Sequence, residues 1–366
     1  MPVAPVLRLG TRGSQLALWQ ANTVASRLAA TGGPPCEIVV IRTSGDQLQS
    51  APLSEVGGKR LFVKEIEDAL LRGEIDLAVH SSKDMPAILP DGVTIAAVLP
   101  REDPLDAIVL PVRAGRTFRP GADATSDLGQ VRLKADATAV VLGQRPSTSV
   151  ASGFSRTLDD LVKHLGQSPA IGTGSVRRIA QLTRLFPGAR FTPIRGNLDT
   201  RLRKLDEGEH DALVLAAAGL RRLGSASRIS MALPADACVP APGQGIVAVE
   251  TREDDGAIRD VIQLINDPAA DAALTAERAL VAALGGGCQT PVGALATMAE
   301  GGKTLELTAI VVALDGSRAV RGEGRGPLSD AAIVGRDVGA QLIADGADEI
   351  LAEARRTQGA VEGIQP

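Results

Sequence analysis

Short apolar runs alternate with segments of helical periodicity through the first two thirds of the chain. This alternation is typical of mostly parallel sheets whose faces are covered by helices. The pattern therefore predicts an α/β fold. The predicted strands span residues 6–10, 36–42, 75–80, 93–99, 190–195 and 211–216.

Two helices between these strands have recognisable ends. Ser14 can cap the start of a helix that stops at Gly32 and Gly33, because serine accepts a hydrogen bond at a helix start and glycine suits a helix end. A second helix is predicted over residues 62–72, before Gly73. The apolar residues that the first helix presents are Leu16, Trp19, Val24 and Leu28.

The composition changes twice further along the chain. Residues 112–156 are rich in Gly, Ala, Thr, Ser and Pro, with only a weak strand signal at 137–142, and are interpreted as an insertion. The last part combines an Ala-rich helix at 268–284, a hairpin turning at Asp315–Gly316 and helical periodicity at 329–355. This part predicts a separate small α+β domain.

Length and composition narrow the classes of protein. A chain of 366 residues is long enough for two or three domains, each with its own core. Hydrophobic residues make up 44% of it but aromatic residues only 2%, which disfavours a stacking platform for single-stranded nucleic acid. The net charge of -4 gives no overall attraction to nucleic acid or to an anionic membrane. Any binding of anions must therefore be local.

Neither a metal site nor a disulfide framework is indicated, because the cysteines have no Cys-x-x-Cys spacing and the histidines are scattered. The N-terminal residues lack the basic region and apolar run of a secretory signal, and no stretch reaches the roughly 18 apolar residues of a membrane span. We therefore expect a cytoplasmic protein with free thiols. The residues concerned are Cys36, Cys238, Cys288, His80, His164 and His210.

Positive charge is concentrated between Ile171 and Leu205, where eight basic residues and one acidic residue give a net charge of +7. Arg177 and Arg178 follow a Gly-Thr-Gly-Ser turn between a short predicted strand and a helix. Cations in a first helical turn oppose the helix dipole, which favours an anionic ligand there. The alternative, two solvated helix faces, stays open on composition alone. A dinucleotide fingerprint is disfavoured because Arg177 replaces its third glycine.

Seven motifs, in order along nearly the whole chain except the insertion, resemble those of the porphobilinogen deaminase family, also called hydroxymethylbilane synthase. They are Leu7–Ala17, Gly57–Lys59 with Leu61–Glu65, His80–Asp84, Gly172–Arg178, Arg195–Asn197 with Thr200–Leu202, Pro242–Gly245, and Gly286–Gln289.

The resemblance implies a transferase of heme and other tetrapyrrole biosynthesis that joins four porphobilinogen units head to tail, releases ammonia at each step and frees the product by hydrolysis. It implies two periplasmic-binding-protein-like (type II) α/β lobes plus a small C-terminal α+β domain. The first lobe is expected at 1–100 and 245–267, the second at 101–244, and the C-terminal domain at 268–366. A monomer with no nucleic-acid or membrane partner is expected.

Cys288 matches the position that, in this family, carries a dipyrromethane cofactor through a thioether. The alternative for a free cysteine is a small buried apolar residue. Glycines at 285–287 argue against that alternative, because a backbone without side chains lets a bulky adduct approach.

Asp84 matches the catalytic carboxylate of the family. Loss of ammonia from porphobilinogen leaves a cation that spreads onto the pyrrole nitrogen, and a fixed carboxylate beside that nitrogen would stabilise it. General-base removal of the ring proton after coupling is a second expected role. The alternative is an aspartate that merely pairs with Lys83 at a strand end.

Further residues are carried over from the resemblance as binding residues. Those expected at the cofactor are Ser81, Lys83, Thr173, Ser175, Arg177 and Arg178. Those expected at the substrate are Arg12, Ser14, Gln20, Lys59, Phe62, Arg195, Arg201, Arg222 and Gln244.

Glu55 and Arg60 differ from the residues common in the family, which are lysine and a small residue. Both lie in the segment with Lys59 and Phe62 that, by the resemblance, covers the site, so the charge of this cover is expected to differ from that of the family. Two other classes of protein share some of these features. A two-lobed binding protein for an anionic solute would explain the arginines but gives Cys288 no task. A nucleic-acid-binding protein would lack both stacking aromatics and overall basic charge.

Overall fold

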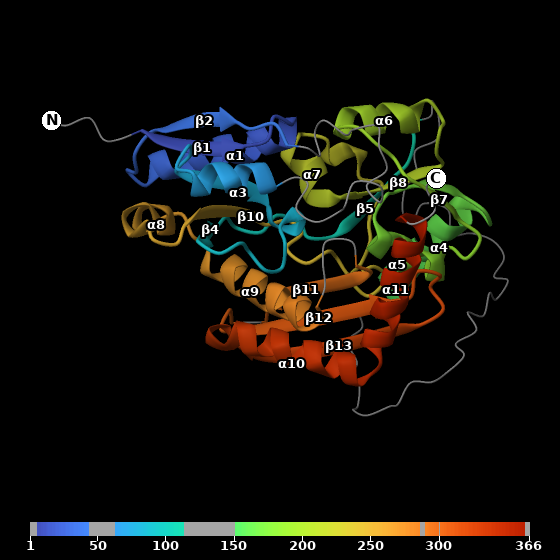
Figure 1. The fold of residues 1–366 in the computed structure, drawn as a ribbon. Coiled ribbons are helices and arrows are strands. Elements are labelled where there is room, and N and C mark those ends of the chain that lie inside the picture. Colours follow the sequence, from blue (N-terminus) through green and yellow to red (C-terminus); the bar gives the residue numbers. More distant parts are fainter. Residues whose placement is uncertain (1–5, 44–62, 113–150, 286–289, 300, 363–366) are drawn as a thin grey trace.

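The computed structural model describes residues 6–43, 63–112, 151–285, 290–299 and 301–362, and within these ranges the strands form three sheets. In Figure 1 the two α/β lobes lie side by side at the top, and the C-terminal domain, in orange and red, lies below them.

The first lobe is built on a five-stranded sheet of order β2-β1-β3-β10-β4. Strand β1 runs parallel to β2 and β3, whereas β10 runs antiparallel to β3 and β4. Strand β10 is the one that the chain adds on its return from the second lobe. The strands are β1 (Leu7–Thr11), β2 (Cys36–Val40), β3 (Leu77–Ser81), β4 (Val93–Val98) and β10 (Val247–Arg252).

Helices α1 (Gln15–Ala30), α3 (Lys64–Leu71) and α8 (Gly256–Gln263) pack on this sheet. Ser14 caps α1 by accepting a hydrogen bond from the Ala17 amide at 3.3 Å, as the sequence predicts. The predicted apolar face is only partly right. Val24 and Leu28 are fully buried, but Trp19 is 37% exposed and does not belong to the core.

The second lobe repeats this topology with the order β7-β6-β8-β5-β9. Strand β6 is parallel to β7 and β8, and β5, the first strand after the chain leaves the first lobe, is antiparallel to β8 and β9. The strands are β5 (Asp106–Val109), β6 (Ala170–Gly172), β7 (Arg190–Thr192), β8 (Ala212–Ala216) and β9 (Met231–Ala232).

The helices of this lobe are α4 (Ala151–Leu165), α5 (Val176–Leu185), α6 (Leu198–Asp206) and α7 (Ala217–Arg222). The start of α4 falls inside the predicted insertion at 112–156, so the end of that segment is helical. The weak strand expected at 137–142 lies outside the described residues.

The chain crosses between the lobes twice, and the two crossings hydrogen-bond to each other. The Glu102 amide donates to the Gly245 carbonyl at 2.9 Å. Gly243 and Gly245 have φ of 73° and 88°, where glycine is favoured. A β-carbon on Gly245 would collide with the Glu102 carbonyl oxygen, and one on Gly243 would collide with Ser82. This close approach explains the two glycines of the Pro-Gly-Gln-Gly motif.

The C-terminal domain has an antiparallel sheet β11-β12-β13 packed under helices. The predicted hairpin at Asp315–Gly316 is confirmed, since it joins β12 to β13. The elements are α9 (Pro268–Ala283), β11 (Val292–Met298), β12 (Thr304–Val312), β13 (Ala319–Pro327), α10 (Ala331–Ala344) and α11 (Ala347–Glu362). The predicted fold class of two type II lobes and a small α+β domain is confirmed, and the exact domain boundaries stay predictions.

Glu277 of α9 joins this domain to both crossings. Its fully buried carboxylate accepts hydrogen bonds from Arg101 Nη1 at 2.6 Å, from the Gly243 amide at 2.6 Å and from the Ala296 amide at 2.7 Å. Arg101 lies in the first crossing and Gly243 in the second. One buried acid therefore holds three parts of the molecule together.

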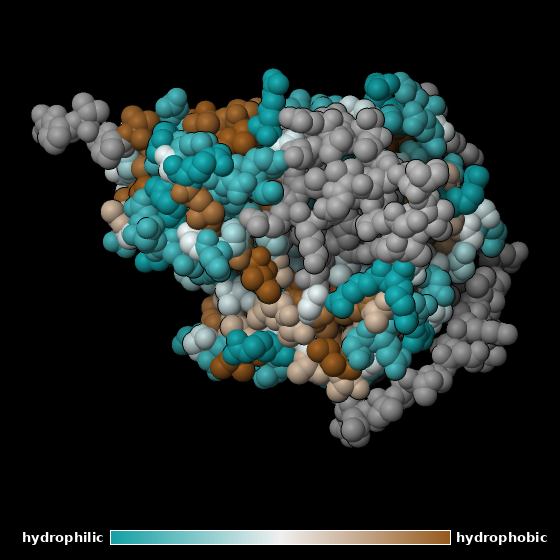
Figure 2. All heavy atoms as spheres, viewed as in Figure 1, coloured by the Kyte–Doolittle hydropathy of each residue, from teal (hydrophilic) through white to brown (hydrophobic). Residues whose placement is uncertain are grey.

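Hydrophobic residues on the face seen in Figure 2 lie in separate groups among hydrophilic ones, and several tan and brown groups cover the C-terminal domain. In the part of the chain that the structure describes, no helix is both long and apolar enough to cross a membrane.

Candidate active site

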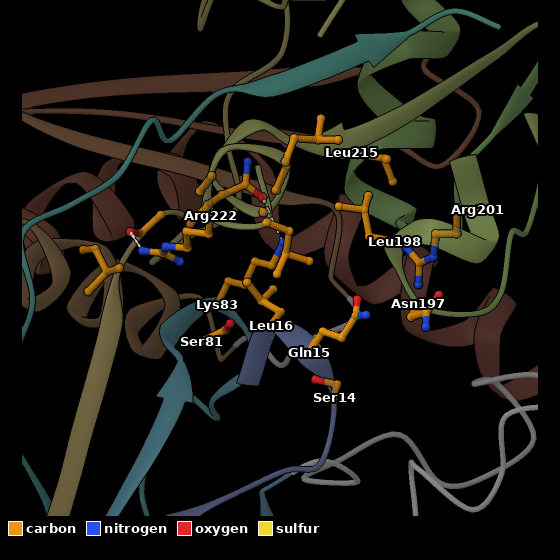
Figure 3. Close-up of a pocket in the computed structure, with 18 of the residues that line it drawn as sticks. Ser14, Gln15, Leu16, Ser81, Lys83, Asn197, Leu198, Arg201, Leu215 and Arg222 are labelled. Carbon is orange, nitrogen blue, oxygen red and sulfur yellow. Dashed lines mark hydrogen bonds between the residues drawn. The ribbon is translucent and has the colours of Figure 1, made fainter. Parts of the chain in front are cut away.

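A cavity of about 240 Å³ lies between the two lobes, beside the second crossing. Helix α1 and the end of β3 form its wall in the first lobe, and α6, β8 and α7 form its wall in the second. Figure 3 shows Arg201 and Asn197 at one side of the cavity and Lys83 and Arg222 toward the other. The predicted site residues that line it are Ser14, Ser81, Lys83, Arg201, Arg222 and Gln244.

The remainder of the cavity wall is largely apolar. Leucines from both lobes supply this apolar surface. None of them was among the site residues predicted from the sequence. A cavity with convergent cations and hydroxyls on an apolar wall suits a small ring that bears carboxylates. The leucines are Leu16, Leu198, Leu215, Leu220 and Leu223.

Lys83 and Asp84 lie on a short 3-10 helix, Ser82–Asp84, directly after β3. Asp84 is exposed and lies within electrostatic range of Lys83 and Arg201. These two cations come from different lobes. The structure therefore gives Asp84 a cationic setting that extends beyond its neighbour in sequence.

Lys83 donates a hydrogen bond from Nζ to Gln244 Oε1 at 3.3 Å. Burial lowers the pKa of Lys83 to about 8, and the positive charges of Arg178 and Arg177 add to this effect. The acids Asp84 and Asp106 act in the opposite direction but do not compensate. An anion bound beside Lys83 would raise this pKa again.

Arg177 and Arg178 are buried around one carboxylate, Asp106 of β5. Arg177 Nη1 donates to Asp106 Oδ2 at 2.7 Å, and Arg178 Nη2 donates to Asp106 Oδ1 at 2.7 Å. Burial alone would raise the pKa of Asp106, but the charges of the two arginines outweigh it and hold the pKa far below its usual range. Asp106 balances one of the two charges, so the protein itself accounts for part of this first-turn positive charge, and the expected role of both arginines at an anionic ligand stays a prediction.

Two glutamines predicted at the substrate are engaged by the protein. Gln244 is 1% exposed, and its Nε2 donates to the Pro104 carbonyl at 2.7 Å and to Asp106 at 3.0 Å. Gln20 is 2% exposed and donates to Ser81 Oγ at 2.8 Å without lining the cavity. Both amides hold residues of the site in place.

The cations of the second lobe crowd together. Arg201 Nε donates to the Gly196 carbonyl at 2.8 Å. Its pKa is lowered by burial and by the neighbouring charges of Arg178 and Arg195, which the charge of Asp84 only partly offsets. Repulsion among these guanidinium groups favours an anion between them.

The other predicted residues lie farther from the cavity or outside the described ranges. Ser175 caps α5 by accepting from the Arg178 amide at 3.4 Å, and buried Thr173 accepts from the Ser175 amide at 3.3 Å. Arg12 and Arg195 are half-buried and do not line the cavity. The roles of these residues stay predictions. Those outside the described residues are Cys288, Lys59 and Phe62, together with Glu55 and Arg60.

Sequence reasoning missed Asp106 and Glu277, which organise the surroundings of the site. No local signal marks either one, because their partners lie 71 and 176 residues away in sequence. Within the described residues, no group of three or more His, Cys, Asp or Glu side chains could hold a metal ion.

Comparisons with known proteins agree with the motifs. Residues 7–132 and 130–260 match "Porphobilinogen deaminase, dipyromethane cofactor binding domain", and residues 272–344 match "Porphobilinogen deaminase, C-terminal domain". Porphobilinogen deaminase of Geobacter sulfurreducens is 41% identical over 95% of this chain and 94% of its own length. That of Syntrophobacter fumaroxidans is 42% identical over 96% of this chain and 98% of its own.

Among solved structures, the Bordetella pertussis BvgS periplasmic VFT2 domain aligns with 71% of this chain and 86% of its own, at 17% identity and a TM-score of 0.36, a distant likeness. The two family matches cover both lobes and most of the C-terminal domain, and the relatives extend over nearly the full chain. The chain belongs to the porphobilinogen deaminase family.

Proposed function

We propose that this protein is a hydroxymethylbilane synthase, a transferase that joins four porphobilinogen molecules head to tail with loss of ammonia and then releases the linear tetrapyrrole by hydrolysis. Family membership supports the reaction. The observation that carries it is the crowding of Lys83, Arg201 and Arg222 around one cavity. Porphobilinogen bears an acetate and a propionate, so each added unit brings two more carboxylates to this wall.

We further propose that a dipyrromethane cofactor is attached through Cys288. The residues present fit such a group, since it carries carboxylates and the site offers unsatisfied cationic donors. In the described residues, buried Nε of Arg177 has no hydrogen-bond partner, and burial lowers the pKa of Lys83 to about 8, which a bound carboxylate would raise again. When bound, the cofactor supplies the terminal pyrrole ring from which the product grows. The residues proposed to hold it are Ser81, Lys83, Thr173, Ser175, Arg177 and Arg178.

The chemistry assigned to Asp84 is electrostatic. The aliphatic amine of porphobilinogen has a pKa near that of lysine, roughly 10, so it is an ammonium at neutral pH and leaves without an added proton. The carbon–nitrogen bond breaks with its electron pair on nitrogen, and the positive charge left on the substrate spreads to the pyrrole nitrogen. The Asp84 carboxylate stabilises that charge and afterwards accepts the proton that coupling releases.

The substrate carboxylates are assigned to the arginine wall. Arg201 and Arg222 line the cavity, and Arg195 adds positive charge behind Arg201. A guanidinium presents a planar fork that matches a carboxylate with two hydrogen bonds. Arg12, Ser14, Lys59 and Phe62 complete the proposed substrate set. The proposed setting is the cytoplasm, where Cys288 stays reduced, and the proposed state is a monomer.

Ammonia release from porphobilinogen tests this proposal against the two-lobed binding protein. The purified chain is incubated with porphobilinogen, and free ammonia and the absorbance of oxidised linear tetrapyrrole are followed together. The enzyme releases four ammonia molecules for each tetrapyrrole. A binding protein retains porphobilinogen and releases none, which would contradict the proposal.

A further inference from the structure

Trp19 is the single tryptophan of the chain and lies on α1 in the first lobe. Its side chain is 37% exposed, although the helical pattern places it on the apolar face. Core packing therefore does not account for it. A partly exposed indole ring presents an aromatic face that can hold a cation.

The indole ring of Trp19 contacts Arg222, at the end of α7 in the second lobe. Arg222 Cζ lies 5.5 Å from the centre of the indole ring, which is within the range of a cation–π interaction. Helices α1 and α7 touch at this point and lie side by side in Figure 1. The contact therefore joins the two lobes.

A second contact fixes the orientation of the same guanidinium. Arg222 Nη2 donates to the Gly245 carbonyl at 2.6 Å, and Figure 3 draws this bond with Arg222 at the edge of the cavity. The ring face restrains the plane of the guanidinium, and the carbonyl restrains its rotation within that plane. Arginine has five N–H donors, so others stay available to an acceptor in the cavity.

The neighbouring arginine shows a different arrangement. Arg221 is paired with Asp103 at 3.0 Å on the surface. In the described part of the chain, no carboxylate forms an ion pair with Arg222, although the side chain is largely enclosed. Arg222 is thus held by an aromatic face and a carbonyl, neither of which neutralises its charge.

We propose that Trp19 is a positioning residue that holds the Arg222 guanidinium for a carboxylate of the incoming pyrrole. This inference rests on the proposed function and adds a residue to it. Since Trp19 and Arg222 belong to different lobes, the position of Arg222 depends on how the lobes are oriented. Trp19 does not contact the reacting atoms, so its loss should weaken substrate binding far more than turnover.

Steady-state kinetics with porphobilinogen test the inference in Trp19→Leu, Trp19→Phe, Arg222→Met and the double variant Trp19→Leu/Arg222→Met. Trp19→Leu should raise KM by roughly 5- to 30-fold with kcat within about twofold, the size of a partly enclosed cation–π contact. Trp19→Phe keeps an aromatic face and should recover most of the affinity. In the Arg222→Met background, Trp19→Leu should add nothing further to KM.

Asn22→Ala, a change at an exposed position on the same helix, is the matched control, and thermal unfolding checks that each variant is folded. An unchanged KM in Trp19→Leu, or an equal rise in KM in the presence and absence of Arg222, would overturn the inference. Both results leave the proposed function standing when the wild-type protein forms tetrapyrrole. A wild-type protein that consumes no porphobilinogen would instead refute the proposed function and, with it, this role of Trp19.

Discussion

Replacing Asp106 by asparagine removes the negative charge that two buried arginines share. Asp106 is fully buried and accepts hydrogen bonds from Arg177 Nη1 at 2.7 Å, from Arg178 Nε at 2.9 Å and Nη2 at 2.7 Å, and from Gln244 Nε2 at 3.0 Å. Asparagine has the same shape, so no cavity forms. It keeps one acceptor oxygen but turns an NH₂ group toward existing donors.

The magnitude follows from the burial of the partners. Arg177 and Arg178 are 4% and 8% exposed, so water cannot replace the lost carboxylate. Removing one partner of a buried ion pair costs about 3–5 kcal/mol. That is a large part of the roughly 5–15 kcal/mol that stabilises a domain. We therefore expect Asp106→Asn to lower the free energy of unfolding of the second lobe by about 3–5 kcal/mol.

Urea unfolding at pH 7, followed by circular dichroism, measures this loss. Asp103→Asn is the matched control, since Asp103 pairs with Arg221 on the surface, where the arginine side chain is 46% exposed. That pair should contribute less than about 1 kcal/mol. If Asp106→Asn unfolds no more easily than Asp103→Asn, the central role given to Asp106 is wrong.

Four further predictions concern the site and its support. The pKa of Lys83 in the folded protein, about 8, lies below its ordinary value of 10.5. Between these two pH values the unfolded chain binds more protons than the folded one, so the free energy of unfolding should rise with pH. Urea unfolding should show this rise in the wild type and not in Lys83→Met. Over the same range the KM for porphobilinogen should increase above pH 8 in the wild type and stay flat in Lys83→Met. A wild-type KM independent of pH would refute a contribution of the Lys83 charge to the cavity wall. Asp84→Asn should reduce kcat by roughly 100-fold or more with little change in KM, which single-turnover measurements of ammonia release would show. Glu277→Gln should lower the free energy of unfolding by about 3–5 kcal/mol because it breaks the buried pair with Arg101, and an unchanged melting temperature would contradict its joining role.

Much of the α/β pattern follows from periodicity. The runs at 6–10, 36–42, 93–99 and 211–216 coincide with strands because each is a short apolar segment bounded by turn residues or helix starts, although β2 at the sheet edge is only partly buried. Strands β5 and β9 did not stand out. Strand β9 has only two residues, which is too short for any period to show.

The Ser14 cap was predicted from a local signal, and Ser175 and Asn197 cap two further helices in the same way. Ser14, Ser175 and Asn197 each accept a hydrogen bond from an amide three residues ahead. Such signals are contained in a few neighbouring residues. They are therefore visible without the fold.

The candidate site was harder to predict because its arginines pair with a carboxylate that lies far away in sequence. A sequence shows Arg177 and Arg178 in a first helical turn, but it does not show Asp106 arriving from β5 beneath them. The partner of Trp19 is likewise distant in sequence. Helical spacing places Trp19 on an apolar face, and only the position of α7 in the fold shows that it faces Arg222. The motifs were enough to identify the family, whereas the partners of the charged residues could be found only from the tertiary structure.

The mass of the intact protein under denaturing conditions tests the central claim most directly. A chain that tethers its primer through Cys288 should be heavier than its sequence by an adduct of two pyrrole units, and Cys288→Ser should have the bare mass of its own sequence. Addition of porphobilinogen should then increase the wild-type mass in equal steps. A wild-type protein that shows only the mass of the unmodified chain, while still producing tetrapyrrole, would contradict the claim.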